Sequence, residues 1–391
     1  MIAKKLLKHF IIIPAICISF CTSGQDKFIK LKDTILMSSL GNPITLHAVN
    51  LGGWLLWEGW MWGGGFTKES VIKERLYNLL GKEAYTNFLQ QYYDNYITEK
   101  DIALIAQHGF NCIRLPFNYR IFEADNNQYI DGFKKLDEVI SWCKKYGLYV
   151  IPDMHAAPGG QNNLFISDPE NTKLWNSEEN QKHANDLWRK IAERYNNDTT
   201  IAGYDILNEP DVNNTATLID FYKTLVKNIR SVDTNHLLII EGNNLAHSFK
   251  GFPAKLDDNQ VYSYHYYPWF NEKNKLKNLK NITSEINTSL LLWCGEWGED
   301  TPENLKEISK LLSAQPNQCG TAFWTWKRIY KNNNRYPLYS IHSIPDWDKI
   351  VAWLTWKISK PNKEQTAKGI EEFLNGIKIE NCEANEISNI N

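Results

Sequence analysis

Neither sign of charge is in excess in this sequence. Its 391 residues include 43 Lys and Arg against 45 Asp and Glu, which gives a formal net charge of −2 at pH 7. A protein that binds nucleic acid or an anionic membrane surface usually carries a basic excess. We therefore predict no nucleic-acid partner and expect an uncharged ligand.

Cysteine is sparse, and its spacing is irregular. Of the seven cysteines, five lie beyond the first 24 residues, at positions 112, 143, 294, 319 and 382. An odd number without a repeated close spacing fits neither a disulfide framework nor a zinc site. The sequence therefore predicts no metal centre.

The start of the chain carries an apolar run that is too short to span a membrane. A basic segment, residues 1–9, precedes 11 apolar residues, 10–20, and this order is typical of a signal peptide. We predict cleavage after Gly24. The alternative is a lipoprotein box that ends at Cys21, but this box is imperfect because Phe20 is bulky where a small residue is expected. The expected protein is exported, whether periplasmic, extracellular or a surface lipoprotein, with residues 1–24 as the signal peptide and no membrane span.

Residues 25–391 show no linker, internal repeat or low-complexity tract, so we predict one domain. Apolar runs bounded by turn residues recur eight times, and segments with helical spacing lie between them. The runs are 44–51, 109–116, 147–154, 201–208, 236–241, 260–266, 289–296 and 319–326. Strands that alternate with helices in this number predict an α/β fold, a (β/α)8 TIM barrel.

Two segments stand outside this alternation. Residues 27–49 predict a short N-terminal β-hairpin around a turn at Gly41-Asn-Pro43, and residues 67–96 predict helices of the same domain. The first strand continues into a Trp-rich segment, residues 54–62, and not into a Gly-rich loop that opens a helix. We therefore predict no nucleotide cofactor.

Polar side chains end the predicted strands. In Tyr204-Asp-Ile-Leu-Asn-Glu-Pro210 an apolar alternation runs into Asn-Glu-Pro, and proline lacks the donor that a strand ladder needs. The carboxyl ends of barrel strands form the face that carries functional groups. The strand-end residues are Arg114, His155, Asn208, Glu209, His265, Tyr267, Glu296 and Trp324. We predict that they form one site.

Two of these residues are carboxylates that can face each other across the barrel mouth. Retaining glycoside hydrolysis requires such a pair, about 5–5.5 Å apart, with one proton donor and one nucleophile. Arg114 and the two histidines can hold one carboxylate ionised, whereas the other must keep a raised pKa to protonate the leaving oxygen.

The motifs IRLPF, DMHAAPGGQ, YDILNEP, YHYYPW, CGEWGE and FWTWK resemble glycoside hydrolase family 5, the cellulase family of a retaining (β/α)8 clan. The resemblance covers residues 27–375, and it implies Glu209 as the acid/base and Glu296 as the nucleophile. It also implies substrate-binding roles: Asn208 at the sugar 2-hydroxyl, Tyr267 and Arg114 beside Glu296, His155 and His265 along the −1 subsite, and Trp324 as the sugar platform.

Within the family, residues 50–58 and 323–327 are most similar to the exo-β-1,3-glucanase branch. There the residue matching Glu58 helps to hold the non-reducing-end sugar, although Glu58 could also be a surface residue that caps a loop. Enzymes of that branch carry an acidic residue a few positions after the residue that matches Gln161. This chain differs, because Asn162 to Ser167 come before the first acidic residue, Asp168. Linkage and exo or endo action therefore stay open, with an endo-β-1,4-glucanase, a β-mannanase or a non-catalytic carbohydrate-binding barrel as alternatives.

The expected partner is a β-glucan polysaccharide or oligosaccharide, and the expected state is a monomer. Further assignments concern aromatic and acidic residues near the strand ends. They are Trp57, Trp60, Trp62 and Trp269 as subsite residues, Asp153 and Glu241 as hydrogen-bonded scaffold, and Glu299 and Asp300 as solvent-facing side chains.

Overall fold

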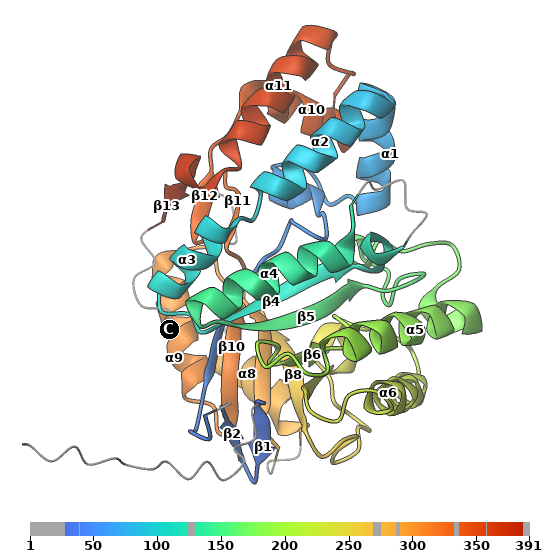
Figure 1. Cartoon of the computed structure of the whole chain (residues 1–391), viewed down its shortest axis with the longest axis vertical. Coiled ribbons are helices and arrows are strands. Elements are labelled where there is room, and N and C mark those ends of the chain that lie inside the picture. Colours follow the sequence, from blue (N-terminus) through green and yellow to red (C-terminus); the bar gives the residue numbers. More distant parts are fainter. Residues whose placement is uncertain are drawn as a thin grey trace, which may run out of the picture.

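A closed barrel of eight parallel strands forms the centre of the computed structural model (Figure 1). The structure describes residues 28–38, 40–123, 130–268, 275–286, 290–331, 336–356 and 358–385. Around the barrel the strands follow one another as β10 (Gln318–Phe323), β3 (Leu46–Asn50), β4 (Cys112–Asn118), β5 (Tyr149–Ala156), β6 (Gly203–Asp205), β7 (Leu237–Glu241), β8 (Gln260–Tyr266) and β9 (Leu292–Trp297). Each strand overlaps one predicted apolar run, so the predicted TIM barrel is confirmed.

Helices between the strands cover the outside of the barrel. They are α3 (Glu99–Gln107), α4 (Gly132–Tyr146), α5 (Glu178–Tyr195), α6 (Thr215–Arg230), α8 (Lys275–Ser284) and α9 (Pro302–Ser313). The short α7 (Asn243–Ala246) instead follows β7, where the Leu245 N–H bonds to the Pro210 carbonyl at 3.1 Å. Local sequence sets their ends. In α4, the Asp131 side chain accepts the Lys134 N–H at 3.1 Å, and Gly147 ends the helix in the left-handed region at φ 72°. Within the described ranges, no helix is both long and apolar enough to cross a membrane.

A second group of helices lies beside the carboxyl end of the barrel, at the top of Figure 1. The helices are α1 (Glu69–Leu80), α2 (Lys82–Asn95), α10 (Pro345–Leu354) and α11 (Lys363–Gly376). Aromatic rings join three of them, since the ring centroid of Phe88 on α2 lies 6.2 Å from that of Trp347 on α10 and 6.4 Å from that of Phe373 on α11. The predicted helical segment 67–96 is confirmed, and its partner helices come from the last 50 or so residues of the chain.

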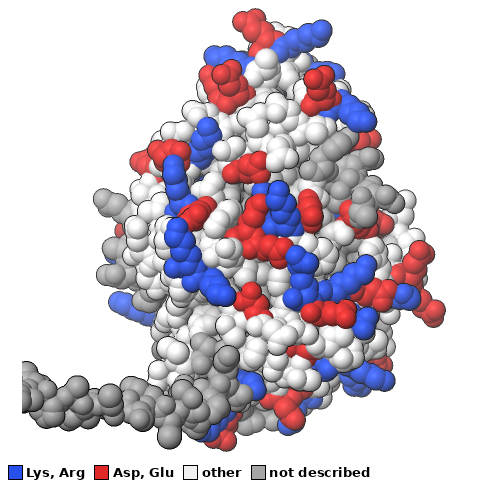
Figure 2. All heavy atoms as spheres, in the orientation of Figure 1, with Lys and Arg blue, Asp and Glu red and all other residues white. Residues whose placement is uncertain are grey.

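Smaller elements complete the fold. A three-stranded sheet pairs β11 (Lys327–Ile329) parallel to β12 (Tyr339–Ile341) and β12 antiparallel to β13 (Glu383–Ala384). Short 3-10 helices occupy connecting loops: η1 (Gly59–Trp62), η2 (Tyr119–Phe122), η3 (Phe165–Ser167), η4 (Leu174–Asn176) and η7 (Ile379–Asn381). Lys, Arg, Asp and Glu are interspersed on the face shown in Figure 2.

The predicted N-terminal hairpin is present, but its tight turn lies earlier than predicted. Strand β1 (Lys30–Lys32) pairs antiparallel with β2 (Ile35–Met37), and Asp33 takes the left-handed conformation at φ 55°. The Gly41-Asn-Pro43 segment makes a second turn, after which the Ile44 N–H bonds to the Leu36 carbonyl at 2.9 Å. The hairpin lies at the amino end of the barrel (Figure 1), and Leu36 is buried in the same apolar cluster as the strand interiors.

The barrel interior is apolar at the amino end of the strands and carries charged side chains at the carboxyl end. In β7, alternate side chains are Leu237, Ile239 and Glu241, and all three are buried. The first two belong to the apolar cluster at the amino end, whereas the carboxylate stands at the other end. Because alternate strand residues face the same side, one strand supplies both the apolar support and a charged group above it.

Candidate active site

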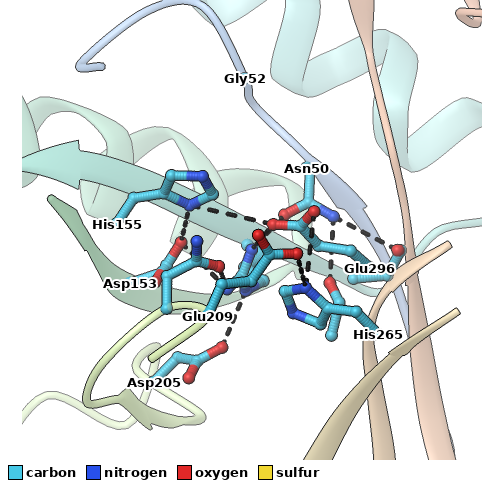
Figure 3. Close-up of polar contacts among 12 residues, drawn as sticks. Asn50, Gly52, Asp153, His155, Asp205, Glu209, His265 and Glu296 are labelled. Carbon is cyan, nitrogen blue, oxygen red and sulfur yellow. Dashed lines mark hydrogen bonds and ion pairs between the residues drawn. The ribbon is translucent and has the colours of Figure 1, made fainter. Parts of the chain in front are cut away.

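A cluster of buried polar side chains fills the carboxyl end of the barrel (Figure 3). Each member is at most 8% exposed: Asn50, Arg114, Asp153, His155, Asp205, Asn208, Glu209, Glu241, His265 and Glu296. Half-buried Tyr267 and buried Trp324 border this cluster. The structure therefore brings together all the predicted strand-end residues.

Arg114 is the centre of the cluster. Its Nε donates to Asp205 at 2.8 Å, its Nη1 to Glu296 at 2.8 Å, and its Nη2 to Glu241 at 3.0 Å. Its Nη2 also lies 3.1 Å from Asp153. Burial alone lowers the pKa of Arg114, but these carboxylates raise it well above its usual value, so the guanidinium is a permanent cation that fixes the positions of its partners.

Glu296, on β9, is surrounded by donors. Besides the Arg114 bond to Oε1, the Tyr267 hydroxyl donates to Oε2 at 2.7 Å. His155 Nδ1 lies 3.9 Å from Oε1 and is itself held by Asp153 at 2.7 Å. A carboxylate that receives charge-assisted and hydroxyl donors is stabilised in its ionised form. Glu296 thus has the surroundings that a nucleophilic carboxylate needs.

Glu209, just after β6, has different surroundings. Its Oε1 contacts His265 Nδ1 at 2.7 Å, and its backbone is left-handed at φ 43°. That backbone is held on both sides, since its N–H bonds to Glu241 at 2.7 Å and its carbonyl accepts from Asn162 at 2.9 Å. Burial alone raises the pKa of Glu209, but the hydrogen bond and charge of His265 lower it below the usual value. The raised pKa that we expected for the proton donor is therefore not found, because His265 lies so close to Glu209.

The two glutamates are close enough for double displacement. One oxygen of Glu209, one oxygen of Glu296 and a nitrogen of His265 all lie within 4.8 Å of one another. Inverting glycosidases separate their carboxyl groups by about 6.5–9.5 Å to admit a water, whereas retaining ones use about 5–5.5 Å. The spacing fits direct attack by one carboxylate.

The same three residues have the ligand atoms of a metal site. However, Arg114 and Tyr267 already donate to the two oxygens of Glu296, and both nitrogens of His265 face carboxylates, Glu209 at 2.7 Å and Glu241 at 3.1 Å. A buried guanidinium bonded to a proposed ligand also opposes a second cation. The surroundings suit proton transfer better than metal binding.

Two further predicted residues have features that suit a sugar ligand. Asn208 accepts from Arg114 through Oδ1 at 2.8 Å, while its buried Nδ2 donates to no atom of the described residues. A buried donor without a partner is costly, and a ligand hydroxyl can satisfy it. Trp324 stacks on His155, with ring centroids 5.5 Å apart and planes at 27°.

Glu58 is not the surface residue that one interpretation allowed. It is 2% exposed, and Trp60 Nε1 donates to its Oε2 at 2.7 Å. It lies in the loop after β3, where Gly52 packs against Trp324 so closely that an added Cβ would lie 2.8 Å from the ring. The loop therefore belongs to the wall beside the site, but Glu58 itself is a buried, hydrogen-bonded group.

The tryptophan assignments need correction. Trp57 and Trp62 are each 1% exposed, and their ring centroids lie 4.5 Å apart within the aromatic core. They are therefore not subsite residues. Trp60 is 8% exposed and lies 4.8 Å beneath the Arg328 guanidinium. Trp269 lies outside the described residues. Glu299, which we expected to face solvent, is buried at 2% exposure.

Sequence reasoning missed two members of the cluster. Asp205 binds Arg114, and Asn50 accepts from Arg114 at 3.1 Å while donating to the carbonyls of Gly295 and Ala322 at 3.2 Å. The available signal was a polar residue inside a buried strand, because such a residue must find a partner. Asp153 and Glu241, predicted as hydrogen-bonded scaffold, are both buried and bonded as predicted.

Comparison with known proteins gives a matching family and several relatives. Residues 76–329 match the family model Cellulase (glycosyl hydrolase family 5). The chain is 36% identical over 250 residues to a β-xylosidase of Phanerodontia chrysosporium, covering 62% of this chain and 52% of that protein. It is 37% identical over 192 residues to Endoglucanase C of Acetivibrio thermocellus, covering 48% and 55%.

A third relative is a probable glucan 1,3-β-glucosidase A of Aspergillus clavatus, 30% identical over 237 residues, covering 58% of this chain and 56% of the relative. The chain thus spans about half the length of these curated relatives. The family model spans well over half of the chain and includes both strand-end glutamates. The chain therefore belongs to glycosyl hydrolase family 5, the cellulase family.

Proposed function

We propose that the protein is a retaining glycoside hydrolase that cleaves β-glucosidic bonds of a β-glucan by double displacement. The observation that carries the proposal is the pair Glu209 and Glu296, with oxygens within 4.8 Å and unlike partners. Glu296 has the donors that stabilise a carboxylate charge, whereas Glu209 shares a short contact with a titratable ring. Environment separates a nucleophile from a proton donor here.

The reaction follows from these positions. An ionised Glu296 oxygen attacks the anomeric carbon while Glu209 gives a proton to the leaving glycosidic oxygen, which breaks the glycosidic bond and forms a glycosyl ester on Glu296. Glu209, now ionised, takes a proton from water, and the resulting hydroxide attacks the anomeric carbon. The ester bond breaks, Glu296 regains its charge, and the sugar keeps its anomeric configuration.

For the substrate we favour exo action on β-1,3-linked glucan. Support comes from the similarity of residues 50–58 and 323–327 to that branch and from the relative named as a probable glucan 1,3-β-glucosidase. An endo-acting β-glucanase is the second candidate, because the chain is 37% identical to Endoglucanase C over 192 residues but 30% identical to the glucosidase relative over 237 residues. The β-xylosidase relative adds β-xylosides to the compounds that need testing.

A substrate panel tests both parts of the proposal. The purified chain is incubated with laminarin-type β-1,3-glucan, β-1,4-glucan, β-mannan and β-xylosides, and products are separated by size over time. The proposal predicts single glucose units from laminarin-type chains from the first time points. A ladder of mixed oligosaccharides from β-1,4-glucan would favour the endo candidate, and no hydrolysis of any β-glycoside would contradict the proposed activity.

A further inference from the structure

Glu241 contacts both halves of the proposed catalytic pair. Its Oε1 accepts from Arg114 Nη2 at 3.0 Å and faces His265 Nε2 at 3.1 Å, and its Oε2 accepts the backbone N–H of Glu209 at 2.7 Å. The side chain is fully buried at the end of β7. A hydrogen-bonded chain therefore runs from Glu209 through His265, Glu241 and Arg114 to Glu296.

The position of His265 limits where protons can lie. Its Nδ1 faces a Glu209 oxygen at 2.7 Å, and its Nε2 faces Glu241, so both ring nitrogens have carboxylate partners. A neutral imidazole has one N–H and can donate to only one of them. Either the ring is a cation between two carboxylates, or it is neutral and one of the two carboxylates carries the proton. The cationic state and the state with the proton on Glu209 differ only by transfer of one proton across the short Nδ1 to Oε1 contact.

We propose that Glu241 is a positioning residue that acts through His265. It holds a proton on the imidazole, and this is the proton that Glu209 delivers to the leaving oxygen. In the free protein the proton lies on Nδ1 of His265. When a glycosidic oxygen approaches Glu209, the proton moves from Nδ1 to the carboxylate and then to the leaving group. Nε2–H stays bonded to Glu241 throughout, so the ring ends neutral and the charge of Glu241 is unchanged. This inference rests on the proposed function of Glu209.

Other charged groups nearby agree with this assignment. Those that face His265 or Glu241 from neighbouring elements are Arg114 on β4, Asp205 on β6, Glu209 after β6, His247 after α7 and Glu296 on β9. In addition, Tyr222 on α6 donates to the Glu241 carbonyl at 2.9 Å. The carboxylates outnumber the cations within this set, so the local field favours a protonated ring.

The titration directions support the geometry. Burial alone lowers the pKa of His265, but the charges of Glu241 and Glu296 and the bonds to Glu209 and Glu241 raise it well above its usual value. The charge and hydrogen bond of the same ring lower the pKa of Glu209. A proton donor with a lowered pKa is unsuitable alone, but it can act when a neighbouring ring supplies its proton.

The test is the pH dependence of Glu241→Gln, which removes the charge and keeps the shape. Without that charge His265 loses its proton at lower pH, so the basic limb of kcat/KM should move down by about one pH unit or more. At neutral pH, hydrolysis of an oligosaccharide should fall at least about tenfold, while an activated aryl glycoside, which needs little protonation, should fall less than about threefold. Glu241→Asp should return the basic limb toward its wild-type position.

Matched variants separate the possible failures. Asp153→Asn removes another buried carboxylate, one that holds Arg114 and His155, so it should slow both substrates alike and leave the basic limb in place. If Glu241→Gln behaves in that way too, Glu241 is only a structural anchor and the inference is wrong. If Glu209→Gln keeps its rate on poor leaving groups, the proposed function of Glu209 fails instead.

A measurement on the unaltered protein avoids any folding defect. Nitrogen NMR of His265 in the free wild-type chain distinguishes a ring with two N–H groups from a ring with one. We expect both ring nitrogens to be protonated at pH 7. A neutral ring at that pH would overturn the inference.

Discussion

Arg114 and Glu296 lie on strands separated by β3 and β10, and yet the guanidinium Nη1 donates to the carboxylate Oε1 at 2.8 Å inside the barrel. Both side chains are almost fully buried. Removing the cation would leave Glu296 beside Asp205, Asp153 and Glu241 without compensation, which is costly in a buried site. The ion pair therefore places the proposed nucleophile beside a permanent cation and fixes its position inside the barrel.

The two glutamates should respond differently to the leaving group. We expect Glu209→Gln and Glu296→Gln each to reduce turnover of oligosaccharides by several orders of magnitude. With activated aryl glycosides, Glu209→Gln should recover much of the rate, because such leaving groups need little protonation, whereas Glu296→Gln should not. Steady-state kinetics on a leaving-group series measures this. Equal damage to aryl glycosides in both variants would contradict the assigned roles.

The spacing of the two glutamates makes a prediction about stereochemistry. Oxygens within 4.8 Å fit the short carboxyl separation of retaining enzymes, so hydrolysis should retain the anomeric configuration. Proton NMR of the first-formed sugar, recorded before mutarotation, distinguishes the two outcomes. An inverted first product would rule out double displacement.

Because Glu58 is buried, substitutions that test its role in binding also affect stability. Glu58→Ala would leave the indole N–H of Trp60 without this acceptor, at a cost of about 1–3 kcal/mol in stability. Glu58→Gln keeps an oxygen acceptor, so its thermal stability should change less than that of Glu58→Ala. If the carboxylate binds a terminal glucose, Glu58→Gln should lower kcat/KM on short β-glucan oligosaccharides by about ten- to a hundredfold. An unchanged rate would make Glu58 scaffold and favour endo action.

A buried ion pair away from the glutamates should dominate local stability. Lys327 Nζ lies 2.9 Å from Asp101, both side chains are fully buried, and Trp326 Nε1 donates to the same carboxylate at 2.8 Å. Lys327→Met leaves that charge uncompensated and should lower the free energy of unfolding by about 3–5 kcal/mol in denaturant titration. The double variant with Asp101→Asn should recover part of the loss, since no buried charge remains. A loss below about 1 kcal/mol in the single variant would mean that water reaches the pair.

The barrel and its strand-end residues could be predicted because both depend on local pattern. Leu237, Ile239 and Glu241 alternate as a strand requires, and the carboxylate falls where the apolar run ends. In the same way, Asn208 and Glu209 lie between the end of β6 at Asp205 and Pro210. These signals need no knowledge of distant partners, so eight strands and the site residues on them follow from the sequence. The signal peptide, with cleavage after Gly24, lies outside the described residues and stays a prediction.

What the sequence could not show depends on contacts between distant segments. Trp62 looks like a loop residue, but its carbonyl accepts from Trp347 at 3.3 Å, 285 positions away, and its ring belongs to a core built from both ends of the chain. Burial of Glu58 has the same origin. The lowered pKa of Glu209 was also beyond reach, because it depends on how closely His265 approaches.

The most direct test of the central claim is to trap the covalent intermediate. A 2-deoxy-2-fluoro glycoside with an activated leaving group should label the wild-type protein once, because the fluorine slows both formation and hydrolysis of the glycosyl ester, whereas the activated leaving group speeds only its formation. Peptide mass spectrometry of the labelled chain should place the sugar on Glu296, and Glu296→Gln should take up no label. A sugar found on Glu209 or Glu241, or hydrolysis without any trapped ester, would contradict double displacement through Glu296.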